Sequence, residues 1–171
     1  DAQESRGLGD VYKRQMNATA VAALSTTQAQ ALTTAQIAVL SATGIDALAS
    51  DEVQGWTTTQ LGAITSQQIA ALTTTALADF SETQLGALTS TQMRGLTTSQ
   101  LNTLATTQLN ALNVADLSAT QIRGMDATAV AALSTTQAQA LTTLQIAALS
   151  TTGLAALSSD EVQGWSTTQP V

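Results

Sequence analysis

The sequence of 171 residues contains no cysteine and no histidine. These absences exclude disulfides, thiolate nucleophiles, imidazole bases and the usual zinc and haem ligands from this region. No stretch approaches the roughly 18 consecutive apolar residues of a membrane span, so we expect no membrane insertion here. The single proline, Pro170, disfavours a disordered O-glycosylated stalk, which is usually rich in proline. We therefore predict no cofactor and no metal site.

Positive charge is also scarce, with 5 lysines and arginines against 12 carboxylates and a net charge of −7. After residue 15 the only cations are Arg94 and Arg123. Such a surface does not neutralise a phosphate backbone, so we expect no nucleic-acid partner. Residues 5–15 resemble the in-frame translation of a sequencing adapter. We therefore expect residues 1–15 to be adapter-derived and unstructured, and the chain to be a fragment from assembled environmental DNA.

What the sequence does contain is an eight-residue repeat, whose positions we number 1 to 8. A large apolar residue occupies position 8, and a second apolar residue usually precedes it by three at position 5. Both intervals, three and five, are odd, which disfavours a simple strand, and an eight-residue advance turns a helical stripe by about 80°. The pattern therefore predicts a helix interrupted once per octad. Position 8 is held by Leu24, Leu32, Leu40, Leu48, Trp56, Ile64, Leu72, Phe80, Leu88, Leu96, Leu104, Leu112, Met125, Leu133, Leu141, Leu149, Leu157 and Trp165.

Each octad also carries its own helix start. Position 1 is usually Ser or Thr and position 4 is usually Gln, as in Thr89 and Gln92. This is a capping box, in which the hydroxyl and the amide satisfy each other's backbone N–H groups. Isolated helices this short are marginal, so they must stack, with small Ala or Gly residues allowing close approach. We predict an all-α solenoid with one short helix per octad, and a β-solenoid is the alternative.

A longer period encloses the octads. Residues 16–60 match residues 125–169 at an offset of 109, with 37 of 45 positions identical. The offset is thirteen octads and a five-residue unit, Asn113–Leu117. We therefore divide the chain into a first super-repeat, 16–124, and the start of a second, 125–171.

The most varied stretch runs from Asp51 to Trp56 and recurs from Asp160 to Trp165. As a binding surface, the two indoles could stack on a sugar and the two aspartates could hold a cation. As structure, the carboxylates favour a helix N-terminus and the tryptophans replace leucine in the core, and we favour this interpretation. Adjacent carboxylates do not face each other on a helix, and the serines lack an activating base, so we predict no enzyme.

The octads resemble the Thr/Gln/Ala/Leu-rich arrays of very long bacterial surface and adhesin-like proteins, over residues 16–169. The resemblance implies a structural spacer, located outside the cell or on the cell surface, whose partners are neighbouring repeats of the same chain. It brings no catalytic residues. The alternative is a binding module whose repeated face engages a glycan, a protein or ice. Thr pairs that form a hydroxyl ladder would supply that face: Thr26-Thr27, Thr58-Thr59, Thr74-Thr75, Thr106-Thr107, Thr135-Thr136 and Thr151-Thr152.

Overall fold

The computed structural model describes residues 17–165, which form short α-helices and one 3-10 helix and contain no strand. The all-α prediction is confirmed and the β-solenoid alternative is wrong. The adapter-like segment 1–15 lies outside the described residues. The helices are α2 (Ala18–Ala22), α3 (Thr26–Gln30), α4 (Thr34–Val39), α5 (Ala42–Ile45), α6 (Ser50–Gln54), α7 (Thr58–Leu61), α8 (Ser66–Ala71), α9 (Thr74–Ala78), α10 (Glu82–Gly86), α11 (Ser90–Met93), α12 (Thr98–Thr103), α13 (Thr106–Ala111), η1 (Val114–Asp116), α14 (Ala119–Gly124), α15 (Ala127–Ala131), α16 (Thr135–Gln139), α17 (Thr143–Ala148), α18 (Thr151–Ala156) and α19 (Ser159–Gln163).

The capping boxes set where the helices begin. At α11, Thr89 is extended, with φ −69° and ψ 158°. Its hydroxyl accepts from the Gln92 amide at 3.3 Å, while Gln92 Oε1 accepts from the Thr89 amide at 2.9 Å. Where position 1 is alanine, as at Ala49, the side chain at position 4 still accepts from the backbone N–H. The N-cap residues preceding the α-helices are all extended, so the chain turns before each helix.

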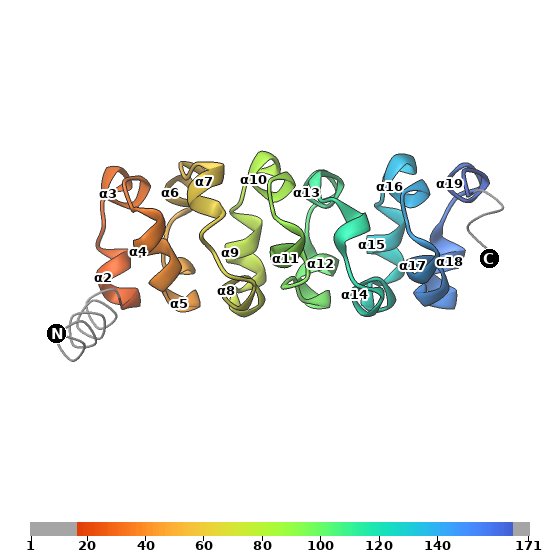
Figure 1. Ribbon diagram of the computed structural model, residues 1–171, viewed down its shortest axis with the longest axis horizontal. Coiled ribbons are helices and arrows are strands. Elements are labelled where there is room, and N and C mark those ends of the chain that lie inside the picture. Colours follow the sequence, from red (N-terminus) through yellow and green to blue (C-terminus); the bar gives the residue numbers. More distant parts are fainter. Residues whose placement is uncertain (1–16, 166–171) are drawn as a thin grey trace.

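The short helices wind into coils of three. Helix α2 packs against α5, α3 against α6 and α4 against α7, so the stacking contacts join helices that lie three units apart. We call three consecutive units a coil and each junction between units a corner. Figure 1 shows the coils following one another along the long axis, from α2 at one end to α19 at the other. The octad pattern alone does not set this number of helices per coil.

The interior is filled by the two apolar positions of each octad. At position 5, Ile37 and Leu101 are fully buried, and at position 8, Ile64 and Leu96 are each 2% exposed. These side chains belong to one continuous hydrophobic core that runs from coil to coil. Burial of both positions is why the odd spacing recurs throughout the chain.

The five-residue unit replaces one whole octad. Its 3-10 helix η1 forms one side of a coil, and Val114 and Leu117 are buried at 1% and 4% exposure, as positions 5 and 8 are elsewhere. Two asparagines join the coils on either side of it. Asn102 Oδ1 accepts from the Asp126 amide at 3.1 Å, and Asn110 Oδ1 accepts from the Ser134 amide at 3.0 Å. The solenoid therefore continues through the short unit without losing its core.

Candidate functional site

The contacts that repeat most regularly between coils come from the glutamines at position 4. Gln92 Nε2 donates to the carbonyls of Leu61 at 2.9 Å and Ile64 at 2.7 Å, both in the preceding coil. Gln100 Nε2 donates in the same way to Ile69 at 2.7 Å and Leu72 at 2.9 Å. We call this set of side chains the glutamine ladder. Its described members are Gln60, Gln68, Gln84, Gln92, Gln100, Gln108, Gln121, Gln137 and Gln145.

The chemistry of the amide explains this choice. A glutamine side chain offers one oxygen acceptor and two N–H donors. The oxygen completes the capping box, and the N–H donors reach carbonyls at the end of a helix in the coil before, where the last carbonyls of a helix lack i+4 partners. Within residues 17–165, no buried side-chain nitrogen or oxygen lacks a hydrogen-bond partner. One side chain thus caps its own helix and ties that helix to the preceding coil.

Two octads use glutamate at position 4 and lose half of this function. Glu52 is 8% exposed and accepts from the Ala49 amide at 2.8 Å, and Glu161 caps Ser158 in the same way at 2.6 Å. A carboxylate has no N–H to donate. For Glu52, the equivalent acceptors in the preceding coil are the carbonyls of Val21 and Leu24. The ladder therefore lacks its pair of hydrogen bonds at this position.

The tryptophans of the candidate surface lie in the core ladder. Trp56 is 3% exposed, and its Nε1 donates to the carbonyl of Ala29 at 2.9 Å. Trp165 is partly buried and donates to Ala138 at the same distance. Alanine at position 5 of the preceding coil leaves room for the indole, which a leucine there would fill. This burial favours the structural interpretation of both indoles over a sugar-stacking role.

The aspartates of the same motif are exposed. Asp51 Oδ2 accepts from the Thr26 hydroxyl at 3.4 Å, and the Asp51 carbonyl accepts from Gln30 Nε2 at 3.1 Å. The Asp160 carbonyl is bound by Gln139 Nε2 in the same way. The Asp51 side chain therefore contacts the preceding coil, and the Asp160 backbone does the same.

The two copies of the motif also lie on different sides of the solenoid. Helix α6 packs on α3, whereas α19 packs on α16. One super-repeat comprises fourteen units, counting the five-residue one, and fourteen is not a multiple of three. Each further copy is therefore turned by a third of a coil, and the structure does not bring Trp56 and Trp165 together.

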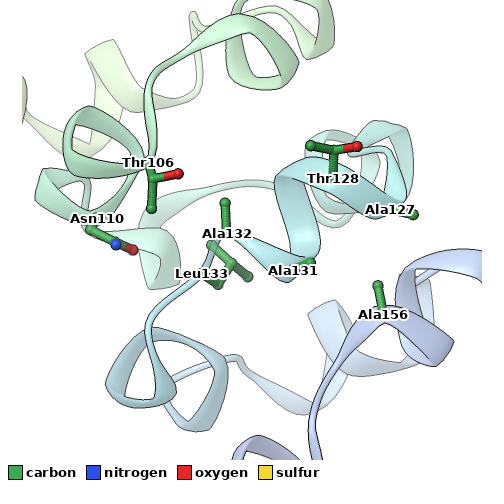
Figure 2. A pocket seen from close by; sticks show the side chains of 8 residues that line it. All are labelled: Thr106, Asn110, Ala127, Thr128, Ala131, Ala132, Leu133 and Ala156. Carbon is green, nitrogen blue, oxygen red and sulfur yellow. The ribbon is translucent and has the colours of Figure 1, made fainter.

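Concave surface is present beside the short unit. A shallow concavity of about 810 Å³ lies between α13, α15 and α18, and its lining includes Ala127, Ala131, Ala132 and Ala156. Figure 2 shows the side chains that line it. Its polar lining includes Asn110, whose oxygen already accepts from a backbone amide of the next coil. No charged side chain lines this concavity, so it offers no reactive group.

Among residues 17–165, no group of three or more acidic side chains is placed to hold a metal ion. No helix in this part of the chain has both the length and the apolar character needed to cross a membrane.

Sequence reasoning missed the second role of glutamine and the bridging asparagines. The signal was present in the choice of glutamine itself, because a capping box accepts Glu and Gln alike. The preference for Gln over Glu at position 4 indicates that its N–H groups are also used. Asn102 and Asn110 gave no comparable signal, since their register depends on the shortened coil.

Together these contacts define a solenoid repeat protein with three-sided coils and an amide ladder between them. No family model, no curated protein and no solved structure matches the chain.

Proposed function

We propose that this chain is a non-catalytic structural spacer region of a large bacterial surface or secreted adhesin-like protein. The observation that carries the proposal is the glutamine ladder, in which every member from Gln60 to Gln145 donates to the position 8 carbonyl of the preceding coil and to a second carbonyl nearby. In a stack of this kind each coil contacts only its neighbours, so the array lengthens by adding coils. A spacer needs that property and no reactive group.

The use of the polar side chains supports the same conclusion. Hydroxyls at position 1 accept from backbone amides, as Ser118 does from Gln121 at 3.2 Å. The amides of the glutamine ladder are occupied by capping and by the bonds to the preceding coil, as at Gln92. Serine, threonine and glutamine thus serve the architecture itself. A location outside the cell or on its surface rests on the resemblance of the octads to adhesin-like arrays.

A repeat-face binding module is the second candidate, and one observation favours it. Along the side formed by α4, α7, α10, α13, α15 and α18, position 3 is an exposed threonine in every helix except α4, which has Ala35 there. The threonines are Thr59, Thr83, Thr107, Thr128 and Thr152. We call this set the threonine row. Around it, positions 6 and 7 are Gly or Ala except at Asn110. The face is therefore flat and carries few charges, which suits a flat ligand such as a glycan, a protein or ice.

The spacer proposal is tested by length. A variant carrying a further copy of residues 16–124 after residue 124 should increase the maximum dimension in small-angle X-ray scattering in proportion to the added coils. A collapsed particle, with little change in maximum dimension, would contradict a spacer.

The second candidate is tested by binding. A glycan array and a thermal-hysteresis assay on the 171-residue chain should both be negative for a spacer. If either is positive, Thr83→Lys with Thr107→Lys should abolish it, whereas Thr27→Lys with Thr75→Lys, on another side of the solenoid, should not. That pattern would replace the spacer with a binding module.

A further inference from the structure

Two octads place a carboxylate where the glutamine ladder places an amide. Glu52 and Glu161 are 8% and 7% exposed, so both side chains are more than nine-tenths buried. One carboxylate oxygen, Oε2, accepts from the N-cap amide, at 2.8 Å from Ala49 and 2.6 Å from Ser158. Because glutamate and glutamine have the same shape and share this cap, the other oxygen, Oε1, takes the place that Nε2 holds in the ladder.

That place faces two backbone carbonyls of the preceding coil. In four rungs of the ladder, Nε2 donates to the carbonyl oxygens 31 and 28 residues earlier, at 2.7 to 3.2 Å. The same intervals lead from Glu52 to the carbonyls of Val21 and Leu24. Three oxygen acceptors therefore meet there, with no N–H group between them.

The second copy of the motif repeats this arrangement. The same intervals lead from Glu161 to Val130 and Leu133, which are the equivalents of Val21 and Leu24 in the second super-repeat. Each group of oxygens lies between two coils that the structure describes. Neither group therefore lies on an end face of the solenoid.

No cationic side chain pairs with these glutamates. Within residues 17–165 the only cations are Arg94, at the C-terminus of α11, and Arg123, in α14, whereas α6 packs on α3 and α19 on α16. A carboxylate that leaves water costs free energy unless a positive charge or hydrogen-bond donors pair with it. Oε1 makes no hydrogen bond in this part of the chain, where no buried side-chain oxygen lacks a partner, so this atom stays in contact with water. A hydrated cation can therefore reach it.

We propose that a calcium ion binds between the Glu52 carboxylate and the carbonyls of Val21 and Leu24, and that Glu161 forms the equivalent site. Ca²⁺ takes carboxylate, backbone carbonyl and water oxygens at about 2.3 to 2.6 Å in flexible geometries. The ion links a capping carboxylate to the preceding coil, as the N–H groups of glutamine do in the ladder. Because each site has a single carboxylate, we expect a Kd of about 10⁻⁴ to 10⁻³ M.

This inference goes beyond the proposed function, because a spacer stacks with or without the ion. Composition predicts no metal site, since cysteine and histidine are absent. The carbonyl ligands of the proposed sites belong to the backbone, which composition does not show. The exposed aspartates of the motif, Asp51 and Asp160, are not ligands in this proposal.

The test replaces each carboxylate with the amide of the ladder. Calorimetric titration of the full 171-residue chain with calcium chloride should give one bound ion for each of the two glutamates. Glu52→Gln should lower the stoichiometry by one ion, and Glu52→Gln with Glu161→Gln should lose both. These variants keep their fold, because glutamine at position 4 completes a rung. Circular dichroism in calcium-free buffer checks this.

The matched control is Asp51→Asn with Asp160→Asn, which makes the same charge change at exposed positions beside the two glutamates. It should retain both ions. Thermal unfolding followed by circular dichroism gives a second readout, with sodium chloride of equal ionic strength as the reference. Calcium at about 10 mM should raise the midpoint of the native chain by at least about 2 °C and should not raise that of the double glutamine variant.

Three results would overturn the proposal. The first is a native chain whose midpoint and titration show no response to calcium. If the double glutamine variant is then the more stable chain at neutral pH but not in acid, a proton and not a metal completes these rungs. The second result is calcium binding that survives the loss of both glutamates. The third is an equal loss of binding in the control, which would assign the ions to the exposed aspartates.

Discussion

Replacing Gln84 with glutamate isolates one rung of the ladder. Gln84 is 2% exposed and donates from Nε2 to the carbonyls of Val53 at 2.8 Å and Trp56 at 3.0 Å. Its Oε1 accepts from the Ser81 amide at 2.9 Å. Gln84→Glu preserves the size of the side chain and this cap. The substitution removes only the two bonds to the preceding coil.

The structure sets the size of the expected effect. Two inter-coil hydrogen bonds contribute about 1 kcal/mol each, and two carbonyls are left facing a buried carboxylate, which adds a desolvation cost. We therefore expect Gln84→Glu to lower the free energy of unfolding by about 3 to 5 kcal/mol. Gln67→Glu makes the same charge change at an exposed side chain and should lie within about 0.5 kcal/mol of the native chain.

The assay must be local, because a repeat array does not unfold strictly in two states. The chain has 2 tryptophans, so a Trp165→Phe background leaves Trp56 as the only indole. Its fluorescence during urea denaturation reports the coil whose carbonyl Gln84 binds. Circular dichroism recorded on the same samples reports the helices of the whole array.

The reasoning fails if Gln84→Glu shifts the Trp56 transition no more than Gln67→Glu does. That result would mean that apolar stacking alone joins the coils and that glutamine serves only as a cap. A loss of helix throughout the chain in the absence of urea would instead show that the ladder is needed for folding.

Three further substitutions test neighbouring contacts, each by urea denaturation followed with circular dichroism. Glu52→Gln supplies the missing donor and removes a buried charge, so it should stabilise the chain by about 1 to 3 kcal/mol, and a loss of stability would contradict the ladder. Trp56→Phe removes the indole N–H and some core volume, and should cost about 1 to 3 kcal/mol, whereas no change would mean that the hydrogen bond contributes nothing. Gly95→Ala should cost about 1 to 3 kcal/mol, because its Cβ would overlap the Ser66 carbonyl. The control, Gly62→Ala, meets backbone oxygens only at 3.4 Å and should be neutral or stabilising by up to about 1 kcal/mol.

Local rules made much of the fold predictable. A hydroxyl at position 1 with glutamine at position 4 acts within one octad, so the start of each helix follows from neighbouring residues alone. The same holds for burial, because Ile37 in α4 and Leu40, the C-cap residue of that helix, lie three residues apart and are both buried. The need to stack followed from length, since helices this short do not persist singly.

The candidate binding surface was less predictable. Trp56 could be assigned to the core from its place in the repeat, but its bond to the Ala29 carbonyl joins residues 27 positions apart. That contact exists only because three helices complete a coil. With two or four helices per coil, the same indole would meet a different octad.

The sequence by itself determined the short capped helix, its two buried positions and the requirement for a stack, because each depends on forces that act within eight residues. The tertiary structure decided the three-helix coil, the rotation of successive super-repeats and the choice of carbonyl for each glutamine. The sequence of an octad does not specify how many octads make up one coil. That number follows from the packing of the side chains in three dimensions, and it determines which residues lie one coil apart.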